Sequence, residues 1–141
     1  MGIRMPGPEP QAVVIVEDDS GMSHALERIL RIAGFRPVAY CSAEALIEAD
    51  GAANAACLIL DVHLPGLSGF ELSRCLVEKG SKAPVIFISA YDELDSRERA
   101  MKAGAVAYLT KPFPGQTLLE KVAIAMGTEM TSGRVNAKSN G

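Results

Sequence analysis

Residues 12–34 read AVVIVEDDSGMSHALERILRIAG. The first five are continuously apolar, which is typical of a short strand buried on both faces of a sheet. After the acids at 17–19, apolar residues recur with the spacing of one helical face, at Met22, Leu26, Ile29, Leu30 and Ala33. A glycine then follows at position 34. This stretch therefore predicts one strand, one amphipathic helix and a helix stop.

The same unit recurs along the chain. Further candidate strands are Pro37–Cys41, Cys57–Leu60, Val85–Ile88 and Val106–Leu109. Helix starts are marked by Ser20, Ser42 and Ser68, the last with Glu71 in a capping-box pattern. Helix stops are marked by Gly34, Gly51, Gly80, Gly104 and Gly127. Five strand–helix units in strict alternation predict an α/β fold, a flavodoxin-like doubly wound (βα)5 sandwich with a parallel sheet in the order 2-1-3-4-5.

Length and composition limit the other possibilities. The chain has 141 residues, enough for one ordinary domain. We expect a flexible N-terminal arm at residues 1–10, the domain at 11–127, and a flexible tail or truncated linker at 128–141. The net charge of −3 gives no broad cationic field, so nucleic-acid binding by this chain is not expected. The longest apolar run has about one third of the roughly 18 residues that a membrane span needs, so a cytoplasmic location is expected.

Three cysteines occur, at positions 41, 57 and 75. Their number is odd and their spacing is unlike that of a zinc site. We expect reduced packing residues.

Chemistry-bearing residues follow the predicted strands. Ligands of an open parallel sheet bind outside the carboxyl ends of its strands. Those ends carry the acids at 17–19, then Asp61, Ser89 and Lys111. The fold should bring these distant residues to one edge of the domain.

Crowded carboxylates favour a cation. Two unit charges about 4 Å apart repel by about 4 kcal/mol at an effective dielectric constant near 20. Oxygen ligands without His or Cys favour a hard ion, and a few carboxylates suit Mg²⁺. A metal facing Lys111 makes a pocket for a phosphoryl group. Asp61 is then the candidate nucleophile, with the acid pair on the metal and Ser89 and Lys111 on the phosphoryl oxygens. The simpler interpretation of any one acid at 17–19 is a helix cap.

Four stretches carry a family resemblance. They are VIVEDD at 14–19, LILDVHLPGLSGFEL at 58–72, PVIFISAYD at 84–92 and AMKAGAVAYLTKPF at 100–113. Together they resemble the receiver domain of response regulators in bacterial two-component signalling, a CheY-like superfamily, over about residues 12–126. The last stretch is most similar to the nitrogen-fixation and LuxR-type regulators.

The resemblance implies roles for individual residues. Asp61 would be the phospho-acceptor, and the donor would be a sensor histidine kinase or a histidine phosphotransfer protein. Mg²⁺ would be held by Glu17, Asp18, Asp61 and the backbone carbonyl of His63. Ser89 and Tyr108 would be the switch residues. Lys111 would precede a cis peptide bond to Pro112.

The resemblance also bears on output. The resemblance implies that the face made by the fourth helix, fifth strand and fifth helix would signal, and that it could form a homodimer. The domain would not be an enzyme beyond catalysing its own phosphorylation and slow dephosphorylation. The chain would be a stand-alone receiver or the receiver portion of a longer regulator. We further expect the His63 side chain to lie over part of the phosphoryl pocket and to change the rate at which the phosphoryl group is hydrolysed.

Other functions stay open at this point. The principal alternative is a receiver-like protein-interaction module that works without phosphorylation. A haloacid-dehalogenase-type phosphatase would need a second acid where His63 stands. A flavodoxin would place FMN phosphate against the acids, which would repel it. His24 is interpreted as an exposed helical residue.

Overall fold

A parallel sheet with helices on both faces organises residues 12–127, the part of the chain that the computed structural model describes. The strands are β1 (Ala12–Val16), β2 (Arg36–Tyr40), β3 (Cys57–Asp61), β4 (Val85–Ser89) and β5 (Ala107–Thr110). The helices are α1 (Ser20–Ile32), α2 (Ala43–Glu48), α3 (Gly69–Glu78), α4 (Leu94–Lys102) and α5 (Gly115–Ala125). Strands and helices alternate throughout, which confirms the predicted (βα)5 pattern.

The strand order is β2-β1-β3-β4-β5, and every neighbouring pair is parallel. This confirms the predicted flavodoxin-like order. The order reverses between β1 and β3, where the chain leaves the centre of the sheet in opposite directions. The ends of these two strands therefore flank the crevice in which such sheets bind their ligands.

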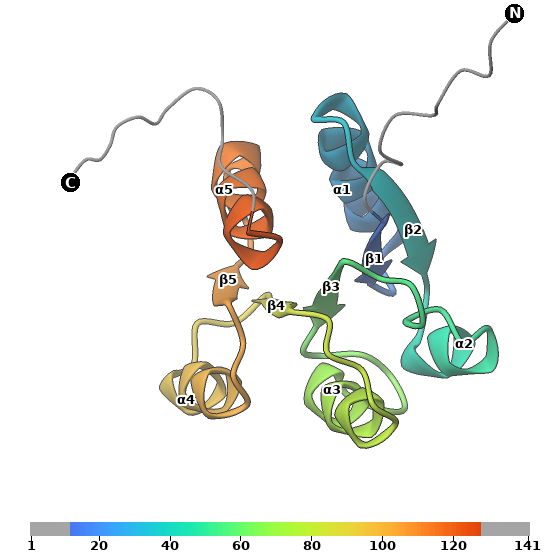
Figure 1. Cartoon of the computed structure of the whole chain (residues 1–141). Helices are drawn as coiled ribbons and strands as arrows, with labels where there is room; N and C mark the ends of the chain where they lie inside the picture. The colour runs from blue at the N-terminus through green and yellow to red at the C-terminus, as the bar shows by residue number, and fades with distance from the viewer. Residues whose placement is uncertain (1–11, 128–141) are drawn as a thin grey trace, which may run out of the picture.

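Two hydrophobic layers cover the sheet (Figure 1). Helices α1 and α5 lie on one face, where Leu26 and Leu118 pack against Ile15 and other residues of the strands. Helices α2, α3 and α4 lie on the other face, where Leu46 and Phe70 belong to the second core cluster. The central strands β1 and β3 are buried along their whole length because both faces are covered.

The ends of the elements differ slightly from the sequence-based expectation. Strand β2 runs over Arg36–Tyr40, one residue earlier than predicted, and is only partly buried because it lies at the edge of the sheet. Strand β5 begins one residue later than predicted. Strands β3 and β4 each extend by one residue, because Asp61 and Ser89 pair in register with Ile88 and Thr110 of the neighbouring strands.

The residues at the ends of two helices differ from those predicted from the sequence. Ser20 is the first residue of α1, and its cap is Asp19, whose side chain accepts a hydrogen bond from the Met22 backbone. After α2 the left-handed residue is Asp50, with φ of 51°, where we expected Gly51. Ser42 caps α2 as predicted, and Ser68 and Glu71 form the predicted capping box at α3.

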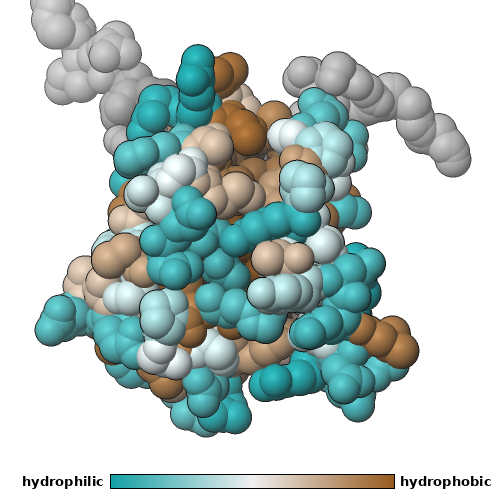
Figure 2. Space-filling view, turned by 180° about the vertical axis from the view of Figure 1, so that it is seen from behind, coloured by the Kyte–Doolittle hydropathy of each residue, from teal (hydrophilic) through white to brown (hydrophobic). Residues whose placement is uncertain are grey.

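The side of the molecule that faces away from the viewer in Figure 1 is mostly hydrophilic (Figure 2). Hydrophobic residues gather there toward the end that carries α1 and α5. Within residues 12–127, none of the helices is long and apolar enough to cross a bilayer. The predicted arm at 1–10 and tail at 128–141 lie outside the described residues.

Candidate phosphoryl-acceptor site

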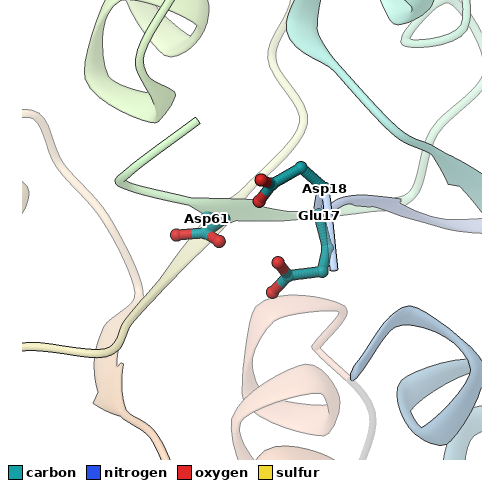
Figure 3. Close-up of side chains that lie close together, drawn as sticks. All are labelled: Glu17, Asp18 and Asp61. Carbon is teal, nitrogen blue, oxygen red and sulfur yellow. The ribbon is translucent and has the colours of Figure 1, made fainter. Parts of the chain in front are cut away.

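Three carboxylates meet where β1 and β3 end (Figure 3). Glu17 and Asp18 directly follow β1, and Asp61 is the last residue of β3. One oxygen of each lies within 4.8 Å of the others. Glu17 and Asp61 are buried, with 2% and 4% of their surface exposed, while Asp18 is exposed. The side chains that the sequence separates are thus brought into one cluster.

Lys111 reaches this cluster from the end of β5. Its Nζ atom lies 2.7 Å from Glu17 Oε1 and 3.1 Å from Asp61 Oδ2. Its backbone N–H donates to the carbonyl of Ser89, and its bond to Pro112 is cis, as expected. The ammonium group therefore contacts both buried carboxylates at once.

Burial and pairing act on the pKa values of these groups in opposite directions. Burial raises the pKa of Glu17, an effect that the hydrogen bond from Lys111 offsets only in part because Asp61 adds repulsion. Burial lowers the pKa of Lys111, but the hydrogen bond to Glu17 and the charges of Asp61 and Glu17 outweigh it, so the net shift is upward. Lys111 is therefore held in its charged form at neutral pH.

Backbone contacts fix the two buried carboxylates. The Asp19 N–H donates to Glu17 Oε2 over 3.1 Å, and the His63 N–H donates to Asp61 Oδ1 over 2.9 Å. The remaining Asp61 oxygen faces Lys111. Asp19 itself turns its side chain to the start of α1, so among the three acids at 17–19 it is the one that serves as a helix cap.

Gly69 lies directly against the backbone of Asp61. A Cβ atom at this position would overlap the carbonyl oxygen of Asp61. The start of α3 therefore packs directly against the backbone of the acceptor candidate. No local pattern in the sequence marks this glycine as required, because only the close approach of two chain segments creates the requirement.

A hydrogen-bonded chain runs from Ser89 toward the surface. Ser89 is fully buried, and its Oγ accepts the N–H of Tyr91 over 3.0 Å. The carbonyl of Tyr91 accepts the hydroxyl of Tyr108 over 2.8 Å, and Tyr108 is 6% exposed. The predicted switch pair is therefore joined through the backbone of Tyr91, a residue that the sequence analysis did not assign.

The ring of His63 contacts the same segment. It meets the ring of Tyr91 edge to face, with centroids 5.0 Å apart. His63 is exposed, and its backbone N–H is the part that contacts Asp61. The two rings thus connect the loop after β3 with the loop after β4.

The donor set fits a hard divalent cation. Glu17, Asp18 and Asp61 offer only carboxylate oxygens, which suit Mg²⁺. The predicted role of the His63 backbone carbonyl in metal binding stays a prediction. His24 is exposed on α1, as expected. The thiols at 41, 57 and 75 are all free.

The sequence model of the response regulator receiver domain matches residues 13–123. The chain belongs to this family. Receiver domains are signalling domains of two-component systems, and the family confirms the predicted resemblance and the predicted class of function.

Individual relatives agree with the family. Nodulation protein W of Bradyrhizobium diazoefficiens is 40% identical over 113 residues, which cover 80% of this chain and 50% of that protein. Response regulator protein TmoT of Ectopseudomonas mendocina is 36% identical over 84% of this chain and 54% of its own length. The crystal structure of a response regulator receiver protein from Burkholderia phymatum matches with a TM-score of 0.75 and 38% identity, over 84% of this chain and 96% of that one. The chain thus spans about half the length of the curated relatives it matches.

Proposed function

We propose that this receiver domain accepts a phosphoryl group on Asp61 from a phosphohistidine donor, with Mg²⁺, and thereby switches a protein-binding surface. The observation that carries the proposal is the contact of Lys111 Nζ with both Glu17 and Asp61 at the carboxyl edge of the sheet. A buried carboxylate held between a lysine and further acids is suited to forming an acyl phosphate.

The transfer exchanges one bond to phosphorus for another. A carboxylate oxygen of Asp61 attacks the phosphorus atom, the phosphorus–nitrogen bond of the donor histidine breaks, and the imidazole nitrogen keeps that electron pair and takes up a proton from solvent. The His63 N–H holds one Asp61 oxygen, which fixes the direction of the carboxylate. Lys111 and the Ser89 hydroxyl would then bind oxygens of the transferred group.

A divalent cation would be held by Glu17, Asp18, Asp61 and the backbone carbonyl of His63. When bound, it would neutralise charge on the phosphoryl oxygens. Because Glu17 is buried and fixed by the Asp19 N–H, it would act from the inner side of the site, while the exposed Asp18 closes the outer side.

The switch would run through Ser89 and Tyr108. Their link through Tyr91 lies at the start of the segment that leads into α4. A change at Ser89 would therefore reach the face formed by α4, β5 and α5, through which the domain would bind partners or a second copy. The donor would be a sensor histidine kinase or a histidine phosphotransfer protein. Apart from its own phosphorylation and dephosphorylation, the domain would catalyse nothing.

The location we propose is the cytoplasm. Three free thiols are typical of a reducing compartment.

The test is the mass of the protein after incubation with acetyl phosphate and Mg²⁺. Wild type should gain one phosphate, and Asp61→Asn should gain none. Asp50→Asn is the matched control, because Asp50 is an exposed aspartate outside the cluster and asparagine tolerates its left-handed backbone. A wild-type protein that gains no phosphate, or an Asp61→Asn variant that gains as much as wild type, would contradict the proposal. In that case, partner binding that is equal in wild type and Asp61→Asn would favour the phosphorylation-independent module.

A further inference from the structure

Arg97 of α4 contacts three residues on two other segments through one guanidinium group. Its Nη2 donates to Thr110 Oγ1 at the end of β5 over 3.1 Å, and its Nε pairs with Asp92 in the loop before α4. Its guanidinium carbon lies over the ring of Tyr108, 5.0 Å from the ring centroid. One guanidinium group thus donates two hydrogen bonds and makes a cation–π contact, a combination for which arginine is better suited than lysine.

These contacts differ in what they contribute. The pair with Asp92 is well exposed, with 42% and 63% of the two side chains accessible, so it adds little by itself. The cation–π contact covers a tyrosine that is only 6% exposed, and the Thr110 bond fixes the guanidinium above it. The main effect of Arg97 is therefore that its guanidinium group covers the Tyr108 ring.

The covered ring is the outer end of the chain that starts at Ser89. The hydroxyl of Tyr108 donates to the Tyr91 carbonyl, and the Tyr91 N–H donates to Ser89 Oγ. For Tyr108 to leave its buried position, the ring must lose both the Tyr91 hydrogen bond and the contact with Arg97. The position of the ring is thus set from two sides, by the Ser89 segment and by α4.

We propose that Arg97 is a positioning residue that holds Tyr108 in its buried position and so connects the orientation of α4 to Ser89. This inference rests on the proposed role of Ser89 and Tyr108 as a switch. Loss of the cation–π contact and of the Thr110 bond should lower the ratio of buried to exposed Tyr108 by roughly three- to tenfold.

The chain is convenient for measuring this ratio because it has three tyrosines and no tryptophan. Ring-labelled tyrosine gives three sets of NMR signals, and Tyr108→Phe assigns the one of interest. Broadening by a soluble gadolinium chelate reports how exposed each ring is, and Tyr40 serves as the internal reference. Measuring the unphosphorylated protein, and repeating the measurement in Asp61→Asn, keeps the result independent of phosphoryl transfer.

We expect Arg97→Gln to increase the broadening of Tyr108 severalfold and to leave Tyr40 unchanged. Arg97→Lys should give an intermediate broadening of Tyr108, since lysine keeps the positive charge but cannot donate to Asp92 and Thr110 with the geometry of the guanidinium group. Arg99→Gln is the matched control, because Arg99 also lies on α4 but has its guanidinium carbon over Phe70, 4.3 Å from that ring centroid. Unchanged Tyr108 broadening in Arg97→Gln, an equal change in Arg99→Gln, or a change shared by Tyr40 would overturn the inference. Absence of phosphorylation in the mass experiment would instead count against the proposed function.

Discussion

The Nζ atom of Lys111 lies 2.7 Å from Oε1 of Glu17, although 94 positions separate the two residues in the chain. The same ammonium group lies 3.1 Å from Asp61. One cation therefore offsets two buried carboxylates, and much of the electrostatic balance of the site depends on it.

Lys111→Met should destabilise the domain by about 3 kcal/mol at pH 7, because it leaves two buried carboxylates without their cation. The pKa of Glu17 is already raised by burial and should rise further in the variant. A carboxyl with a raised pKa in the folded state costs stability above its unfolded value and recovers it as the pH falls. The deficit of the variant should thus shrink at pH 5.

Urea unfolding at both pH values measures this deficit, with the exposed Lys102→Met as the control. In wild type, Lys111 acts in the same direction, toward greater stability at lower pH, because its pKa is raised above the ordinary value of 10.5. The stabilisation from Lys111 is complete below that value and is lost as the pH rises through the folded pKa. An equal loss of stability in Lys111→Met at pH 5 and pH 7 would contradict the view that Lys111 offsets the charge of Glu17.

Gly69→Ala should displace the backbone of Asp61, because the added Cβ overlaps the Asp61 carbonyl. We expect a loss of about 1–3 kcal/mol in the free energy of unfolding and less phosphate gained from acetyl phosphate. Gly115→Ala is the control, since the atoms nearest to its Cβ would belong to the Ile29 side chain, the nearest of them 3.3 Å away, and not to the backbone. Equal behaviour of the two variants would show that the close approach at Gly69 is not required.

Ser68→Ala should destabilise α3 by about 1 kcal/mol, because it removes one half of the capping box. The other half is Glu71, whose pKa is lowered mainly by its hydrogen bond from the Ser68 backbone. A lowered carboxyl pKa contributes stability above its unfolded value, and that part is lost as the pH falls through the folded pKa. Urea unfolding of Ser68→Ala and Glu71→Ala between pH 3 and pH 7 measures both effects. A Glu71→Ala deficit that stays constant down to pH 3 would count against the capping role.

His63→Ala should speed the loss of phosphate from phosphorylated Asp61 by roughly two- to tenfold, since one ring contact is worth about 0.5–1.5 kcal/mol. The ring of His63 meets that of Tyr91 between the loops that follow Asp61 and Ser89, where it would narrow the path for water. The rate is followed by mass after removal of acetyl phosphate. Tyr91→Leu should act in the same direction, and unchanged rates in both variants would exclude this role.

Cys57 should be the least reactive of the three thiols. It is fully buried, and burial raises its pKa to about 12, so hardly any thiolate forms at pH 8. Cys41 is exposed and Cys75 is partly exposed. A thiol reagent should therefore label two cysteines in the folded domain and the third only after unfolding, and Cys41→Ser should remove the fastest reaction. Rapid labelling of Cys57 in the folded protein would contradict the prediction.

The sequence was sufficient for the strand order, because five apolar runs alternating with five amphipathic stripes permit few right-handed arrangements. It also placed Glu17, Asp18, Asp61, Ser89 and Lys111 at one edge of the sheet, since strand ends carry them. It did not resolve which acid caps α1, and only the position of the Asp19 side chain decided that. It likewise missed Asp50 as the left-handed residue after α2.

Local patterns thus determined the fold class, the family and the set of residues at the carboxyl edge of the sheet, because hydrophobic periodicity and strand ends are properties of adjacent residues. Tertiary structure alone decided which groups touch. The Lys111 contacts, the Gly69 approach to Asp61 and the cover of Arg97 on Tyr108 all join segments from different units. Such contacts depend on the packing of whole helices and strands against each other, and no local spacing in the sequence encodes their distances.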